Sequence, residues 1–130
     1  MIVLDASAVV DWLLGAKAAA AIAARALGGD ETLHAPHLLD VEAASALRRA
    51  ASKGEIAAAR GREALSDLAD LPIRRWPHDG LLPRVWELRD ALSAYDATYV
   101  ALAEILGATL VTCDRRLAGS KGHGAAIWTP

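Results

Sequence analysis

The chain has 130 residues, of which 54% are hydrophobic, and its formal net charge is −2. This length suits one domain with its own core, and the hydrophobic content excludes an intrinsically disordered chain. The nearly balanced charge does not by itself indicate a nucleic-acid partner, although a local basic patch would not show in the total.

A single cysteine, Cys113, excludes an internal disulfide and is typical of proteins in a reducing cytoplasm. No apolar run is long enough to cross a membrane, and the first residues lack the basic head of a signal peptide. The sequence therefore predicts one soluble cytoplasmic domain over residues 1–130, with no membrane partner.

The first half of the chain alternates between short aliphatic runs and helical periodicity, and glycine marks several of the boundaries. Gly15 closes the first predicted helix and Gly54 closes the third. The elements expected here are a strand at 2–5, helices at about 7–14 and 17–27, a strand at 32–35, and helices at 38–52 and 55–70.

The second half continues this alternation. Pro72 and Pro77 bracket its first strand, and Gly107 stops a nearly all-apolar helix. The elements expected here are a strand at 73–76, helices at about 79–92 and 96–106, a strand at 109–114, a polar turn at 115–124 and a strand at 125–128. Strands that alternate with helices predict an α/β fold, with a parallel sheet, right-handed crossovers and helices on both faces.

Four of the sixteen acidic residues lie at positions that are not expected to be on the solvent-exposed surface. Asp5 and Asp114 each end a predicted buried strand, although capping of the following helix would also explain each of them. Glu42 projects from a largely apolar helix face, where an ion pair with an arginine is the alternative. Asp96 lies near the start of an apolar helix, where Ser93 competes with it for the capping position.

These four acids are expected to converge, because strand ends and helix N-termini share one edge of an α/β sheet. Clustered carboxylates repel and raise one another's pKa unless a cation neutralises them. Oxygen ligands with no histidine or cysteine nearby select Mg²⁺ or Mn²⁺ over zinc. A site of this kind suits metal-assisted hydrolysis of a phosphodiester.

Four blocks of the sequence resemble the PIN-domain ribonucleases, and the match is closest to the VapC toxins of bacterial VapBC toxin–antitoxin modules. The blocks are Ile2-Val-Leu-Asp5-Ala-Ser7-Ala-Val-Val, Leu39-Asp40-Val-Glu42, Leu92-Ser-Ala-Tyr-Asp96-Ala-Thr-Tyr-Val-Ala-Leu-Ala-Glu104 and Leu110-Val-Thr-Cys-Asp114-Arg-Arg-Leu. The resemblance covers essentially the whole chain in order, and the third block is its most specific part. It implies a PIN-like three-layer α/β/α sandwich with a central, mostly parallel sheet of four to five strands.

The resemblance also implies an Mg²⁺-dependent endoribonuclease, and Mn²⁺ is expected to substitute. Asp5, Asp96 and Asp114 would hold the metal, whereas Glu42 would either help to hold it or activate the attacking water. Two further positions match residues that commonly support the pocket by hydrogen bonding. These are Ser7 and Thr112.

The partners implied by the resemblance are a structured RNA of the tRNA or rRNA class, an inhibitory VapB antitoxin and a second copy of the chain. Arg115 and Arg116 directly follow a pocket acid, so contacts with RNA phosphates are expected there. The other basic pairs, Arg48 and Arg49 among them, fit solvated helix faces and salt bridges, and Asp11 is expected to be exposed.

Two other protein classes open in a similar way but lack the residues that they need. A phosphatase of the haloacid-dehalogenase type requires a second aspartate two residues after Asp5, where Ser7 stands. A phosphoacceptor receiver domain requires adjacent acids after the first strand and a lysine after a late strand, and neither is present. The remaining alternative is a catalytically weak PIN scaffold that acts mainly as a protein- or RNA-binding module, against which the intact acids argue.

Overall fold

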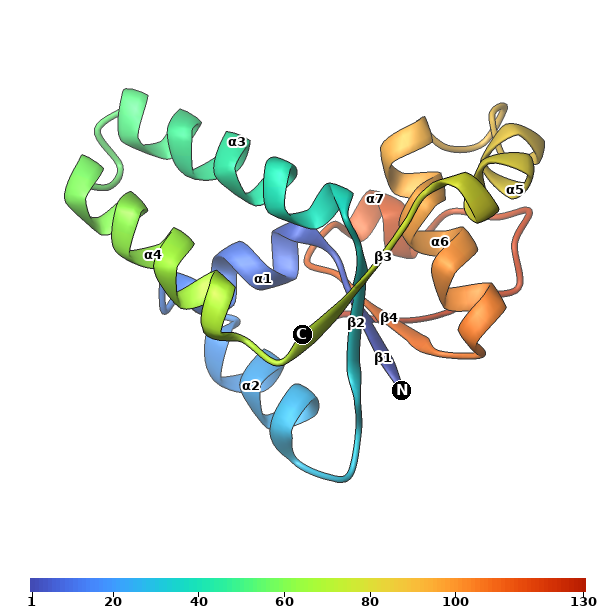
Figure 1. Ribbon diagram of the computed structural model, residues 1–130, viewed down its shortest axis with the longest axis horizontal. Coiled ribbons are helices and arrows are strands. Elements are labelled where there is room, and N and C mark those ends of the chain that lie inside the picture. The colour runs from blue at the N-terminus through green and yellow to red at the C-terminus, as the bar shows by residue number, and fades with distance from the viewer.

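In the computed structural model, which describes residues 1–130, five short strands form one fully parallel sheet in the order β3-β2-β1-β4-β5 (Figure 1). The strands are β1 (Ile2–Leu4), β2 (Leu33–Pro36), β3 (Ile73–Trp76), β4 (Thr109–Val111) and β5 (Ala126–Trp128). The central strand β1 pairs with β2 on one side and with β4 on the other. The strand order therefore reverses at β1, and α/β proteins bind their ligands beside such a switch point, at the carboxyl ends of the strands.

Helices cover both faces of this sheet, so the molecule has the expected three layers. The helices are α1 (Ala6–Leu13), α2 (Ala19–Leu27), α3 (Leu38–Ser52), α4 (Ala58–Asp70), α5 (Leu82–Glu87), α6 (Ala94–Leu106) and α7 (Arg115–Ala118), with a 3-10 turn at Asp79–Leu81. Successive strand side chains point to opposite faces. Ile2 and Leu4 accordingly join the core beneath α1, α2 and α3, whereas Val3 joins the core beneath α5 and α6. The α/β prediction is confirmed.

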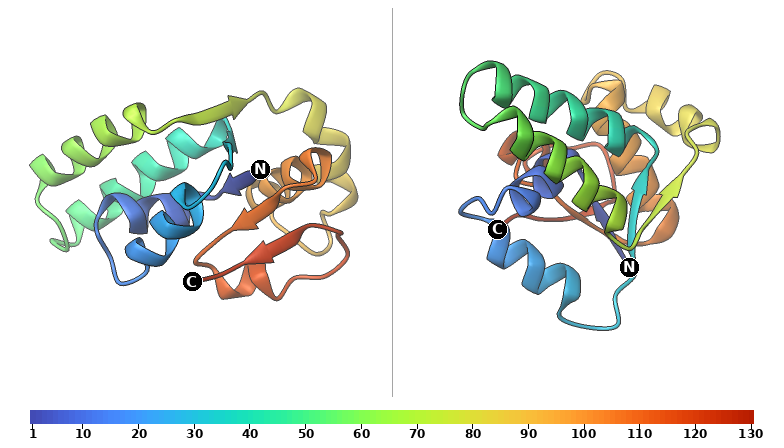
Figure 2. Two further views of the ribbon diagram at one scale, coloured as in Figure 1. Left: turned by 90° about the horizontal axis from the view of Figure 1, so that it is seen from below. Right: turned by 60° about the vertical axis from the view of Figure 1, so that its left-hand side comes forward.

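The helical hairpin α3–α4 packs against α1 and extends beyond the edge of the sheet (Figures 1 and 2). Its α3 helix buries Leu39, Ala43 and Leu47, which are spaced four residues apart and so share one stripe of the helix. This packing fixes the first turns of α3 over the carboxyl end of the sheet. No helix in the molecule is both long and apolar enough to span a lipid bilayer.

The C-terminal part of the chain differs from the prediction. The strand predicted at 109–114 ends at Val111, because its partner strand β1 ends at Leu4 and the next residue, Asp5, caps α1. The predicted polar turn begins instead with the short helix α7. Cys113, expected inside a strand, therefore lies in the link between β4 and α7 and is only half-buried.

Candidate active site

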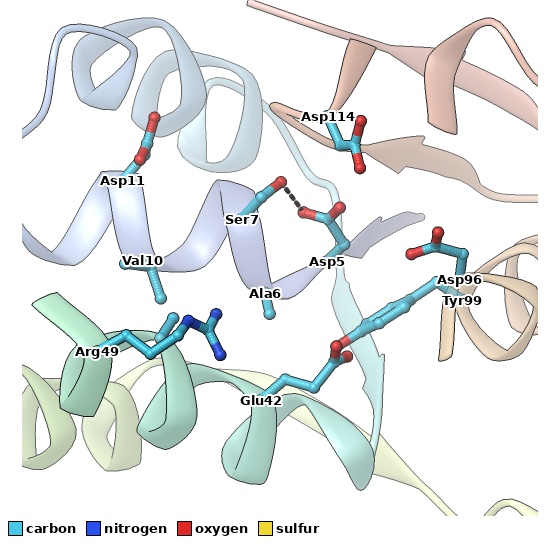
Figure 3. A pocket seen from close by; sticks show the side chains of 11 residues that line it. Asp5, Ala6, Ser7, Val10, Asp11, Glu42, Arg49, Asp96, Tyr99 and Asp114 are labelled. Atoms are coloured by element: carbon cyan, nitrogen blue, oxygen red, sulfur yellow. Dashed lines mark hydrogen bonds between the residues drawn. The ribbon is translucent and has the colours of Figure 1, made fainter. Parts of the chain in front are cut away.

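A pocket of about 330 Å³ lies at the carboxyl end of the sheet, beside the switch point (Figure 3). All four acids predicted from the sequence line it. They are Asp5 after β1, Glu42 on α3, Asp96 on α6 and Asp114 before α7. No three of these carboxylates are yet close enough to bind one metal ion together. The four acids therefore line the same pocket, but in this structure they are too far apart to coordinate one metal ion together.

Asp5 is both a helix cap and a pocket acid. Its Oδ1 accepts hydrogen bonds from the Ala8 N–H at 2.9 Å and from the Ser7 hydroxyl at 2.7 Å. Its Oδ2 accepts a hydrogen bond from the Thr112 hydroxyl. The side chain is almost completely buried. The capping explanation for Asp5 is therefore correct, and it coexists with a position in the pocket.

Ser7 and Thr112 connect the end of β1 to the end of β4. The Ser7 Oγ accepts a hydrogen bond from the Cys113 N–H at 2.9 Å, and the Thr112 Oγ1 accepts one from the Asp114 N–H at 2.9 Å. The two hydroxyl oxygens lie 3.3 Å apart, and each also contacts Asp5. This hydroxyl pair thus fixes the position of Asp5 relative to Asp114.

Asp114 differs from Asp5, because it does not end a strand directly. Its Oδ1 caps α7 by accepting hydrogen bonds from the Arg116 N–H at 2.8 Å and the Leu117 N–H at 3.3 Å. Removal from water raises the pKa of Asp114, but these two amides and the Arg116 guanidinium together bring that pKa below its ordinary value. Asp114 is therefore ionised over a wide pH range.

Asp96 does not cap its own helix. The Ser93 side chain takes that role by accepting a hydrogen bond from the Asp96 N–H at 3.1 Å. The capping question left open by the sequence is therefore settled in favour of Ser93. The Asp96 carboxylate remains free to face the pocket.

Arg116 lies across two of the pocket acids. One guanidinium nitrogen, Nη2, is 3.1 Å from Asp96 Oδ2 and 3.2 Å from Asp114 Oδ2. The side chain is 74% exposed, so this bridge is at the surface. Arg115 is also exposed. Of the two arginines expected to contact phosphate, Arg116 therefore neutralises Asp96 and Asp114 in this structure.

Glu42 has no comparable neutralising partner. Its Oε1 is buried and accepts no hydrogen bond. Burial is the largest cause that raises the pKa of Glu42, and Asp96 and Asp5 raise it further, while the nearby Tyr99 hydroxyl and Arg49 offset part of the rise. Figure 3 shows the Tyr99 hydroxyl beside the Glu42 carboxylate.

Asp5 also has a raised pKa. Burial is the main cause, hydrogen bonds from Thr112, Ala8 and Ser7 oppose it, and the charge of Asp96 adds to it. Asp5 and Glu42 therefore both sit in surroundings that disfavour their ionised forms.

Three polar residues of the pocket were not identified from the sequence. They are Asp11, Arg49 and Tyr99. Asp11 was expected on the surface, but it lies one helical turn after Ser7 on α1 and shares its face. It stands beside the Cys113 thiol, whose pKa is raised to about 12 by burial and by the Asp11 charge. That thiol is protonated at neutral pH and is not a nucleophile.

The chemistry of this donor set fits a hard divalent cation. Every pocket donor is a carboxylate or hydroxyl oxygen, the ligand type that Mg²⁺ and Mn²⁺ prefer. The buried, unpartnered Glu42 Oε1 and the mutual repulsion of Glu42, Asp5 and Asp96 are both relieved by added positive charge.

Comparison with known proteins agrees with the fold. The sequence matches the PIN domain family over residues 2–120. It is 46% identical over 127 residues to Ribonuclease VapC12 of Mycobacterium tuberculosis, covering 98% of this chain and 97% of that protein. It is 51% identical over 117 residues to Ribonuclease VapC9 of the same organism, covering 90% of this chain and 88% of that protein.

A solved structure shows the same fold. The crystal structure of PAE2754 from Pyrobaculum aerophilum superposes with a TM-score of 0.68 at 31% identity, covering 97% of this chain and 81% of that chain. These similarities extend over nearly the whole chain and include every element that contributes an acid to the pocket. The chain therefore belongs to the PIN-domain family and, within it, to the VapC ribonucleases.

Proposed function

We propose that this protein is a metal-dependent endoribonuclease that hydrolyses RNA phosphodiester bonds and acts as the toxin of a toxin–antitoxin pair. The observation that carries the proposal is the convergence of four carboxylates from four separate elements on one pocket at the switch point of the sheet. Kinship with proteins named ribonucleases supports RNA as the substrate.

Three of the acids are assigned to the metal. Asp5, Asp96 and Asp114 would hold Mg²⁺, for which Mn²⁺ can substitute. When bound, the ion supplies positive charge that stabilises the charge developing on the scissile phosphate. Ser7 and Thr112 orient the Asp5 carboxylate through their hydrogen bonds.

Glu42 is assigned to the attacking water. A general base works best when its pKa lies near the operating pH, and the surroundings of Glu42 raise its pKa in that direction. Glu42 lines the pocket, and its carboxylate, whose Oε1 accepts no hydrogen bond from the protein, is assigned to accept a proton from the attacking water. Arg116 bridges Asp96 and Asp114, and we propose that its exposed guanidinium turns toward an RNA phosphate, as does that of Arg115.

The family also supports the choice of partners. We propose that a VapB-type antitoxin inhibits the enzyme, that two copies form a homodimer, and that the substrate is a structured RNA of the tRNA or rRNA class. The enzyme would then act in the cytoplasm, where such RNA is found.

The test is cleavage of purified tRNA and rRNA by the purified protein. We expect cleavage with Mg²⁺ or Mn²⁺, none with EDTA, and a loss of about a hundredfold or more in Asp96→Asn. That variant should keep its fold, because Ser93 caps α6. Asp90→Asn, an exposed acid outside the pocket, is the matched control and should cleave normally. Cleavage that survives both EDTA and Asp96→Asn would overturn the mechanism, whereas a wild type that binds RNA without cutting it would identify a binding scaffold.

A further inference from the structure

Arg49 is the one cationic residue that lines the pocket, and it forms no ion pair. It lines the acid pocket and also a second cavity, of about 330 Å³, that continues along α3. Its guanidinium forms one hydrogen bond, from Nη1 to the Ser45 hydroxyl at 3.0 Å, and no ion pair. Figure 3 shows this guanidinium directed into the pocket between Val10 and Glu42. Glu42 and Arg49 thus form the rim that the two cavities share.

Five other arginines form ion pairs with carboxylates. The ion pairs are Arg25–Glu31, Arg60–Glu63, Arg75–Asp40, Arg84–Glu104, and Arg116 with Asp96 and Asp114. Arg48 is adjacent to Arg49 and equally exposed, but it lines neither cavity. The difference between these two neighbours comes from helical phase, which turns Arg49 toward the same face as Glu42.

The distance between Glu42 and Arg49 along α3 indicates which part of a bound substrate Arg49 can contact. Seven residues separate Glu42 from Arg49, which is two turns, or about 10 Å along the helix axis. Helical side chains lean toward the N-terminus, so the guanidinium extends back toward Glu42 without joining the acids. An RNA strand with its scissile phosphate among the acids would therefore place a neighbouring phosphate at Arg49.

We propose that Arg49 binds the RNA phosphate next to the one that is cut, and so sets the direction in which the strand crosses the pocket. This inference rests on the proposed ribonuclease activity. A guanidinium with four unused N–H donors binds a phosphate through two parallel hydrogen bonds, and an arginine does so with a geometry that a lysine lacks. The hydrogen bond that Arg49 Nη1 donates to the Ser45 hydroxyl holds the side chain in position before RNA arrives.

The experiment compares Arg49→Ala with Arg48→Ala in cleavage kinetics and in binding. A group that holds substrate and transition state equally raises KM and leaves kcat unchanged. We expect KM to rise about tenfold in Arg49→Ala, with kcat and Mg²⁺ affinity close to those of wild type. Arg49→Lys should recover only part of this loss, and Arg48→Ala should match wild type.

The salt dependence of binding provides a second readout that needs no catalysis. In the Asp96→Asn background without metal, Arg49→Ala should reduce the slope of log affinity for a single-stranded oligoribonucleotide against log salt by about 0.7, the value for one lost phosphate contact. Identical effects of Arg49→Ala and Arg48→Ala, in a wild type that does cleave, would overturn this inference alone. A fall in kcat with unchanged KM would also overturn it, since Arg49 would then act on Glu42. A wild type that cleaves no RNA would instead refute the proposed function.

Discussion

Two glutamates, Glu42 on α3 and Glu104 on α6, lie half-buried against the same sheet in opposite electrostatic surroundings. Glu104 accepts hydrogen bonds from Arg84 Nε at 2.8 Å and Nη2 at 3.0 Å, and from the Gly124 N–H at 2.8 Å. These contacts, led by Arg84, bring the pKa of Glu104 below its ordinary value. Glu42 has a buried oxygen without a partner, and burial raises its pKa.

This difference is the one expected between a carboxylate with a structural role and the carboxylate that we propose to be catalytic. Between α5, α6 and the C-terminal loop, the Arg84 guanidinium donates one hydrogen bond to each oxygen of the Glu104 carboxylate. At the pocket it leaves a buried carboxylate beside two other acids, which costs stability. A cleft that holds carboxylates with raised pKa values is a candidate functional site, because function is one reason to retain such a cost.

The largest expected contrast is in catalysis. Glu42→Gln keeps the shape of the side chain but removes its ability to accept a proton, so kcat/KM for RNA cleavage should fall by about 10²- to 10³-fold. Glu104→Gln should cleave RNA at close to the wild-type rate, since Glu104 is outside the pocket. Equal activity of the two variants would show that the free charge at Glu42 has no catalytic use.

The second contrast is in the stability of the metal-free protein. The pKa of Glu42 is raised above its ordinary value of 4.5, so the ionised carboxylate is less favourable in the folded state than in the unfolded chain. The free energy of unfolding therefore falls as the pH rises through and above that value. Glu42→Gln should therefore melt a few degrees above wild type at pH 7, by roughly 2–5 °C, and the difference should shrink below about pH 4.

The pKa of Glu104 is shifted in the opposite direction, so the stability of the protein depends on its ionisation in the opposite way. Its lowered pKa contributes stability above the ordinary value, and that stability is lost as the pH falls through the pKa of the folded state. Glu104→Gln should therefore melt below wild type at pH 7 and approach it in acid. Thermal melts from pH 3 to 8 in EDTA check both variants, and shifts of the same sign would contradict the comparison.

The smallest effect is expected at the surface bridge of Arg116. This side chain supplies positive charge to Asp96 and Asp114, in competition with a bound cation. Arg116→Ala should therefore bind Mg²⁺ about two- to fivefold more tightly than wild type, because an exposed ion pair is weak. Arg115→Ala, the neighbouring exposed residue, serves as the control. Weaker Mg²⁺ binding in Arg116→Ala would show that Arg116 organises the acids more than it competes for them.

The parts of the fold that the sequence predicts well are those with strong local signals. The range 73–76 was predicted to the residue, because Pro72 and Pro77 limit the strand on both sides. The bounds 38–52 were also correct, and the helix ends before Gly54, which adopts the left-handed conformation that favours glycine. Helix α7 was missed because its four residues are too few to show a period.

The four pocket acids could be brought together from topology alone, since each follows a strand end or lies near a helix start on one edge of the sheet. The bridge from Arg116 to Asp96 depends on the unpredicted helix α7 and on side-chain conformations, which no local pattern encodes. Arg49 was accessible to sequence reasoning, because it lies two turns from Glu42 on the same face. The pair Arg48 and Arg49 was expected on a solvated face, and both are exposed, but the sequence pattern did not predict that Arg49 also lines the pocket.

The central claim is that the carboxylates gathered at the switch point bind a divalent cation. Calorimetric titration of Mg²⁺ into the metal-free protein tests it most directly, with wild type, Asp96→Asn and Glu104→Gln measured side by side. We predict the same affinity for wild type and Glu104→Gln, and at least about a tenfold loss in Asp96→Asn. Equal binding by wild type and Asp96→Asn, or a loss confined to Glu104→Gln, would contradict the assignment of the metal to this pocket.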